Sequence, residues 1–218
     1  MTGEAHPILV VAAVRQELEP LFHGLDGGVE VLLTGIGAGR ALDLVQDRLA
    51  RRMYRWVIST GFSGGLRSGF QVGDWVMASE VMEASTGRRW KPPRPLPELG
   101  RSVSIGRFVT VPSLLREPPE KQEAGFRFGA IAVDLETAAV ATAASKASVP
   151  WIAFRAILDP METALPISSR GHGIRSIFTR SGRERLKRFL GLIRAANRSL
   201  AEGLGRLILQ INGARHHC

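Results

Sequence analysis

Short apolar runs separated by turn residues recur along the first 160 residues of the chain. The runs are rich in Val, Ile and Ala, and Gly, Pro or charged residues bound most of them. Continuous apolar runs of this length are typical of strands that are covered on both faces of a sheet. The pattern predicts strands at residues 8–14, 29–33, 56–60, 75–78, 102–111, 130–133 and 151–157.

Helical patterns alternate with these strands. Leu42, Val45 and Leu49 recur at helical spacing, and an alanine-rich segment separates the last two predicted strands. The stretch 129–160 therefore predicts strand, helix, strand, which is the pattern of a parallel crossover unit. A short helix is also expected after Glu17, with Leu18, Leu21 and Phe22 on its apolar side. The basic, Pro-rich residues 86–97 predict a loop.

An apolar stripe marks the end of the chain as a basic amphipathic helical segment at about residues 181–212. The stripe consists of Leu186, Leu190, Ile193, Leu200, Leu204, Leu207 and Ile211. Two interpretations are open. The segment is either a terminal helix packed on the sheet with solvated charges, or a surface that sits on anionic lipid.

Positive charge is unevenly distributed over the 218 residues. The net charge is +9, and the segment 170–206 supplies most of it. An anionic partner or surface is therefore plausible, and the overall basicity leaves a nucleic-acid-binding module as a rival class. No zinc, helix-turn-helix or aromatic-basic RNA motif is present in the sequence, so nucleic acid is the less favoured partner.

Composition favours a single cytoplasmic domain over residues 1–218. Hydrophobic residues make up 44% and charged residues 22%, which is ordinary for a globular protein, and no run approaches the length of a membrane span. The single cysteine, Cys218, fits a reducing compartment. His216, His217 and Cys218 are better explained as a frayed terminus than as a metal site, and we expect no metal.

Carboxylates follow two of the predicted strands. Asp134 and Glu136 come directly after the strand at 130–133, and Asp159 lies just past the strand at 151–157. In open α/β sheets, ligands bind beyond the carboxyl ends of the strands. Each acid taken alone could instead be a turn or helix-terminal residue.

A glycine-rich turn at residues 34–40 precedes the first predicted helix. It lacks the dinucleotide-binding spacing, because Arg40 occupies the place of the last glycine. Backbone N–H groups near Gly37, together with Arg40, could hold an anion. A tight turn with a solvated Arg40 is the alternative.

The phrases VDLETAAVA and VPWIAFRAILD resemble the signature of the purine and uridine phosphorylase superfamily, which includes 5′-methylthioadenosine/S-adenosylhomocysteine nucleosidases. The turn TGFSGGL at residues 60–66 resembles another motif of that family. The resemblance implies a three-layer αβα fold around a central mixed, mostly parallel twisted sheet. It also implies cleavage of a purine nucleoside, no cofactor, and a homo-oligomer.

The resemblance also implies roles for particular residues. Asp159 is the acid near the purine N7, Glu17 activates the attacking water, and Glu136 binds the ribose hydroxyls. Two residues beside Glu136, Leu135 and Asp134, are the remaining ribose-binding candidates. The nucleophile or anion is expected near Gly37, Arg40, Phe62, Ser63 and Gly64.

Some positions depart from the family pattern. Leu158 stands where Ser is usual, and Phe62 stands where the nucleosidases often have Ser. These departures leave open a degenerate member that binds nucleosides without turnover. Glu17 favours water as the nucleophile, whereas Arg15 and Arg40 favour phosphate as a co-substrate; hydrolysis is preferred.

Within the superfamily, the shortened middle of the chain and the pair Glu120-Lys121 look most like the hopanoid-associated phosphorylases. That resemblance implies removal of adenine from an adenosyl-hopane in hopanoid biosynthesis. It would also explain a basic, apolar-striped terminal segment in peripheral contact with an anionic membrane. For the ring that stacks on the base, Phe108 and Phe126 are candidates, although each is better explained as core.

Overall fold

The computed structural model describes residues 6–18, 28–100, 102–165 and 180–213, with side chains described from residue 189 in the last range. In chain order the elements are β1 (Ile8–Ala12), the 3-10 helix η1 (Arg15–Glu17), β2 (Val29–Leu33), α1 (Ala38–Arg51), β3 (Trp56–Gly65), β4 (Trp75–Glu83), β5 (Arg89–Trp90), β6 (Ser104–Thr110), α2 (Pro118–Phe128), β7 (Ala132–Asp134), α3 (Thr137–Lys146), β8 (Trp151–Asp159) and α5 (Arg180–Gly213). All seven predicted strands are present.

The strands of the described residues form one mixed sheet. Its order is β2-β1-β3-β7-β6-β4-β5, and β8 pairs with both β3 and β4. The strands β3, β8, β4, β6 and β7 therefore close into a ring, with β1 and β2 extending from it. Most pairings are parallel, as predicted, although β3 meets β7 and β4 meets β8 antiparallel.

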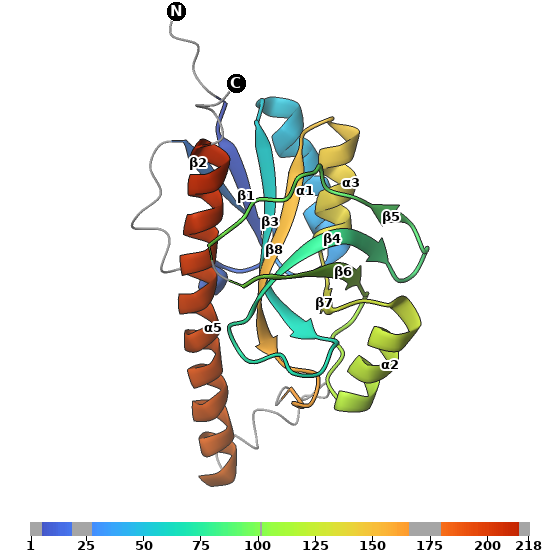
Figure 1. Cartoon of the computed structure of the whole chain (residues 1–218), viewed down its shortest axis with the longest axis vertical. Coiled ribbons are helices and arrows are strands. Elements are labelled where there is room, and N and C mark those ends of the chain that lie inside the picture. Colours follow the sequence, from blue (N-terminus) through green and yellow to red (C-terminus); the bar gives the residue numbers. More distant parts are fainter. Residues whose placement is uncertain (1–5, 19–27, 101, 166–179, 214–218) are drawn as a thin grey trace, which may run out of the picture.

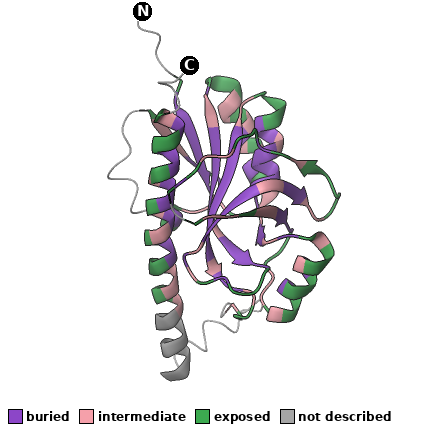
Figure 2. Cartoon of the chain, viewed as in Figure 1, coloured by how far each residue is buried: buried purple, intermediate pink, exposed green. Residues whose placement is uncertain are grey.

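Helices cover both faces of this sheet. In Figure 1, α1 and α3 lie on one side and the long α5 on the other, while α2 lies beside β6 and β7. The predicted three-layer αβα architecture is confirmed. Figure 2 shows that burial is concentrated in the strands and in the helix faces that meet them.

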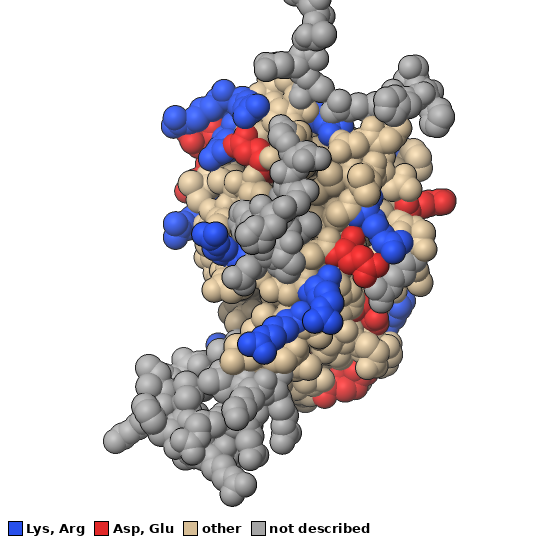
Figure 3. Space-filling view, turned by 90° about the vertical axis from the view of Figure 1, so that its left-hand side faces the viewer, with Lys and Arg blue, Asp and Glu red and all other residues tan. Residues whose placement is uncertain are grey.

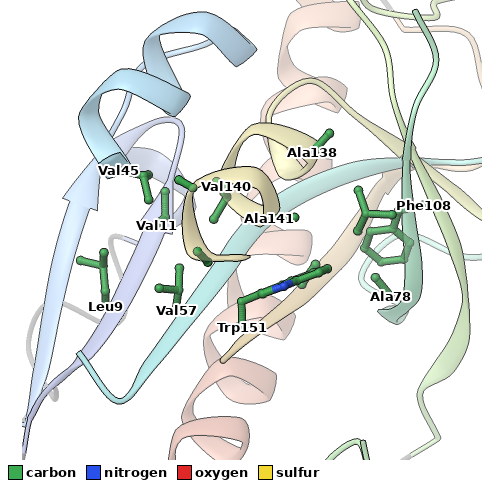
Figure 4. Close-up of a cluster of buried hydrophobic side chains, with 14 of the residues drawn as sticks. Leu9, Val11, Val45, Val57, Ala78, Phe108, Ala138, Val140, Ala141 and Trp151 are labelled. Atoms are coloured by element: carbon green, nitrogen blue, oxygen red, sulfur yellow. The ribbon is translucent and has the colours of Figure 1, made fainter. Parts of the chain in front are cut away.

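Two apolar clusters fill the space between these layers. The first joins the sheet to α1 and α3 and includes Val11, Val45, Val140 and Trp151 (Figure 4). The second joins the sheet to α5. At Gly203 of α5 an added Cβ would meet the Phe154 ring and lie 2.8 Å from Trp75 Cε2, so the missing side chain lets the helix approach the sheet closely.

The described part of the terminal stripe packs on the sheet. Leu200, Leu204, Leu207 and Ile211 are buried, whereas Leu190 is 44% exposed and Leu186 lies outside the described side chains. The packed-helix interpretation is thus confirmed for the second half of α5. Of the helices described, none has the length and apolarity to cross a membrane.

The prediction of a parallel crossover unit at 129–160 was wrong. β7 runs antiparallel to β3, whereas β8 runs parallel to it, so β7 and β8 point in opposite directions. The reason is that β3 continues through the glycine-rich stretch to Gly65 instead of ending at Thr60, and its extension provides an antiparallel partner for β7.

One smaller expectation also changed, and others fall largely outside the described residues. The predicted loop at 86–97 contains the two-residue strand β5, which pairs with β4. The helix expected from Leu18 onward lies almost wholly outside the described residues. Just before it, Arg15–Glu17 form one 3-10 turn, and Leu18 is buried. Leu21 and Phe22 lie outside the described residues, as do His216, His217 and Cys218.

Candidate active site

Two glycines of β3 allow carboxylates to approach its backbone. At Gly61, where φ is +135°, an added Cβ would lie 2.5 Å from Glu17 Oε1 and 2.9 Å from Arg155 Nη1. At Gly64 an added Cβ would lie 3.2 Å from Asp159 Oδ2. One carboxylate therefore lies close to each of these two glycines of β3. A side chain at either glycine would collide with its neighbours, which explains why glycine is found at both positions.

Backbone N–H groups hold Glu17 in place. Its Oε2 accepts hydrogen bonds from the N–H groups of Ala13 (3.0 Å) and Val14 (3.1 Å), and its Oε1 accepts one from Phe62 (3.0 Å). Only 6% of the residue is exposed. The turn after β1 and the strand β3 thus fix both oxygens of this carboxylate.

The glycine-rich turn before α1 binds a carboxylate of the protein itself. Gly37 N–H donates to Glu136 Oε1 at 2.9 Å, so Glu136 occupies a donor at the helix start. Arg40 is exposed, and its guanidinium lies against Gly35, where an added Cβ would be 3.2 Å from Nη1. The loop that we considered for an anion therefore positions Glu136.

Asp134 makes its contacts with neighbouring protein groups. Its Oδ1 accepts hydrogen bonds from Thr110 Oγ1 (2.8 Å) and Thr137 N–H (3.0 Å), and its Oδ2 accepts one from Thr137 Oγ1. The Arg155 guanidinium forms an ion pair with Oδ2 at 3.1 Å. These contacts fix the start of α3 and therefore the position of Glu136.

Arg155 connects β8 to this network. Its guanidinium donates to Thr137 Oγ1 (2.8 Å), to Ser59 Oγ (3.3 Å) and to the Phe62 carbonyl (3.1 Å). The residue is only 2% exposed. A buried guanidinium needs this number of acceptors, because unpaired charge is costly in the interior.

Asp159 pairs with a buried lysine from α2. Its Oδ2 lies 2.6 Å from Lys121 Nζ, and both residues are buried. Burial raises the pKa of Asp159, while the Lys121 ammonium acts in the opposite direction. The net direction is upward, which is what an acid working near neutral pH requires.

Negative charge predominates among the buried groups. They are Glu17, Asp134, Glu136, Asp159, Lys121 and Arg155. Burial is the main cause that raises the pKa of Glu136; Arg155 lowers it, and the charges of Asp134 and Glu17 raise it further. An excess of carboxylates in a low-dielectric region favours a cationic transition state.

The remaining residues expected in the site differ from one another in burial. Leu135 and Phe62 are partly buried against apolar clusters. Ser63 is buried, and its Oγ has no hydrogen-bond partner among the described residues. Phe108 is core, as expected, but Phe126 is 93% exposed, so its assignment to the core was wrong.

The sequence model of the Phosphorylase superfamily matches residues 9–98 and 94–195. The chain belongs to this superfamily. Two relatives with known names are each 27% identical to this chain over the aligned residues. One is a 5′-methylthioadenosine/S-adenosylhomocysteine nucleosidase of Oceanobacillus iheyensis, over 63% of this chain and 70% of that protein. The other is a futalosine hydrolase of Acidothermus cellulolyticus, over 68% and 78%.

Solved structures share the fold. A 5′-methylthioadenosine/S-adenosylhomocysteine nucleosidase of Neisseria meningitidis, in complex with methylthio-immucillin-A, matches 93% of this chain and 98% of its own with a TM-score of 0.74 and 20% identity. A futalosine hydrolase of Helicobacter pylori matches 94% and 97% with a TM-score of 0.72 and 16% identity. The superfamily fold thus extends over nearly the whole chain.

Neither buried cation of this superfamily member has a role that was predicted from its sequence. Arg155 lies in a predicted apolar strand, and Lys121 lies in a short helix whose other residues are mostly exposed. A charged residue inside an otherwise apolar strand is a signal that could have identified Arg155. No comparable signal marks Lys121, because its partner is 38 residues away in the chain.

Proposed function

We propose that this superfamily member hydrolyses the N-ribosyl bond of a purine nucleoside and releases adenine from a 5′-substituted adenosine. The observation that carries the proposal is a set of three buried carboxylates. Glu17 and Asp159 lie against two glycines of β3. Glu136 accepts the Gly37 N–H and lies close enough to Glu17 for that charge to raise its pKa. The names of the relatives, a nucleosidase and a futalosine hydrolase, support this reaction class.

Each carboxylate has a role in the proposed reaction. Asp159 gives its proton to N7 of the base as the C1′–N9 bond breaks. The electron pair of that bond moves onto the base. Glu17 takes a proton from water while the water oxygen bonds to C1′. Glu136 accepts hydrogen bonds from the ribose hydroxyls, and its charge stabilises the cationic sugar. The products are adenine and a 5-substituted ribose.

The surroundings of the acids favour water over phosphate. The Gly37 N–H is taken by Glu136, and the Arg155 guanidinium is taken by Asp134, so neither is open to an anion. Glu17 itself would repel phosphate. Arg40 supports phosphorolysis, but its guanidinium lies over Gly35 at the exposed surface.

For the 5′ side, we propose an apolar substituent of the adenosyl-hopane type. Support comes from the sequence resemblance to hopanoid-associated phosphorylases at Glu120-Lys121 and Asp159-Pro160. Peripheral membrane contact belongs to the same proposal. Because α5 buries its apolar face from Leu200 onward, that contact would be electrostatic in this part of the helix. In Figure 3 the described basic side chains on this side lie in separate groups, several beside acidic ones.

A panel of adenosine derivatives, assayed with and without phosphate, tests the reaction. Chromatography would measure free adenine. We expect release without phosphate and no acceleration by it. Release that needs phosphate would identify a phosphorylase, and binding without release from any derivative would identify a degenerate member.

Two further measurements test the partners. Flotation with anionic liposomes at low salt should carry the protein upward and should fail at high salt. Light scattering should report a dimer or larger homo-oligomer. A protein that stays with the soluble fraction at low salt would remove membrane contact from the proposal.

A further inference from the structure

Lys121 is an unusual residue for the buried face of a helix. α2 buries only Lys121 and Ala124, and the lysine is completely inaccessible to solvent. A buried ammonium is unfavourable unless it is paired and hydrogen-bonded. Its contacts therefore indicate what this position requires.

The ammonium uses its three protons on one short stretch of chain. Nζ lies 2.6 Å from Asp159 Oδ2. It donates to the carbonyls of Thr163 (2.7 Å) and Pro160 (3.1 Å) and, at 3.4 Å, to that of Asp159. A second contact ties the same regions together, because Leu165 N–H donates to the Arg116 carbonyl at 2.9 Å. The end of β8 is thus fastened to α2.

A purely structural clamp explains the three carbonyl contacts but not the short contact to the carboxylate. A clamp could use the carbonyls alone, without placing a buried charge beside the proposed acid. Gly64 adds to the argument, since an added Cβ there would lie 3.2 Å from Oδ2, the oxygen that meets Lys121, and 3.6 Å from Oδ1. Together these groups fix which oxygen of Asp159 is occupied.

We infer that Lys121 is a positioning residue for the acid: it holds Oδ2 of Asp159, so that Oδ1 carries the transferred proton, and it stabilises the carboxylate that forms when the proton leaves. This inference rests on the proposed function. The proton moves from Asp159 Oδ1 to the base, and the ammonium keeps its own three protons. After adenine leaves, solvent returns a proton to Asp159.

The charges around Asp159 determine in which direction its pKa should change when Lys121 is replaced. Among the described residues, Lys121 is the charged side chain that acts on the pKa of Asp159; Gly64 of β3 and Val133 of β7, which lie next to each other here, are uncharged. Without the ammonium, that pKa would rise further. An acid is active while protonated, so the alkaline limb of the pH profile should move to higher pH.

The variant Lys121→Met tests this directly. We expect kcat to fall roughly 10- to 100-fold at neutral pH with little change in KM, and the alkaline limb to rise by about one pH unit. Lys121→Gln keeps a hydrogen-bond donor and should show the same shift. Lys146→Met, at an exposed position of α3, is the matched control and should leave the profile unchanged.

A double variant separates positioning from folding. In the Asp159→Asn background, Lys121→Met should reduce activity little further, because the residue acts through Asp159. Equal losses in both backgrounds, or an unshifted limb in an active Lys121→Met protein, would overturn the inference. A wild-type protein that releases no base would instead overturn the proposed function.

A titration of the wild-type chain keeps the test valid even if the variants fail to fold. The lysines of the chain are Lys91, Lys121, Lys146 and Lys187. One of their side-chain NMR signals should change with pH at the Asp159 midpoint, and this change should vanish in Asp159→Asn. The absence of any such lysine signal would overturn the pairing.

Discussion

The two ends of the candidate site hold their carboxylates by different means. Neutral backbone N–H groups from Ala13, Val14 and Phe62 surround Glu17, whereas the ammonium of Lys121 faces Asp159. Dipoles orient a carboxylate but leave its net charge, while an ammonium compensates it. The difference suits a base that must attract a proton at one end and an acid that must release one at the other.

The largest expected effect comes from removing the acid. Asp159→Asn keeps the size of the side chain but has no transferable proton, so base release should fall by roughly 10³-fold or more while the fold is retained. Adenine release and circular dichroism would measure this. Asp43→Asn, an exposed change on α1, is the control. Near-normal turnover would remove Asp159 from the mechanism.

Removing the base should have the next largest effect. In Glu17→Gln, an amide NH₂ group replaces one carboxylate oxygen. Because Oε1 and Oε2 both accept backbone N–H bonds, the NH₂ group would face another donor in either orientation. Hydrolysis should fall by about 10²-fold, with some loss of stability. Glu123→Gln, exposed on α2, is the control. Turnover equal to that of the control would refute the role of Glu17.

Substitutions at the two glycines of β3 test how tightly the backbone is packed beside Glu17 and beside Asp159. Gly61→Ala combines a φ of +135° with a Cβ 2.5 Å from Glu17 Oε1, so unfolding free energy should fall by about 2–4 kcal/mol. Gly64→Ala should cost less, about 1–3 kcal/mol, because its nearest contact is the Val133 side chain at 2.9 Å. Urea unfolding would measure both.

Gly205→Ala provides the control for these variants. It lies in α5 with no atom within 4 Å of an added Cβ, so alanine should stabilise the helix slightly. If Gly64→Ala were less stable than Gly61→Ala, the expected order of the two losses in unfolding free energy would be wrong.

The smallest effect concerns Glu136 and pH. Burial raises its pKa above the ordinary value, so the folded state binds the proton more tightly than the unfolded chain. The resulting stability is present at low pH and is lost as pH rises through the folded pKa. Relative to Glu136→Gln, the wild type should therefore lose stability from acid to neutral pH. Thermal melts across pH would show the opposite trend if this sign is wrong.

The positions of the strands could be predicted because buried strands are continuous apolar runs. The direction of β7 could not, since it has only three residues and pairs parallel with β6 and antiparallel with β3. Glu136 and Asp159 could be selected as candidates because each follows a strand. Lys121 and Arg155 could not be assigned partners, because their pairs join elements that are brought together only by the tertiary fold.

The proposed base and the proposed acid both contact one strand. Gly61 and Gly64 are three residues apart in β3, and that strand is held by β1, β7 and β8 at once. The separation of the two points where Glu17 and Asp159 meet β3 is therefore set by the covalent geometry of this strand. Engineered changes of specificity should consequently keep the purine-ribose unit constant and vary only the group attached at the far carbon of the sugar.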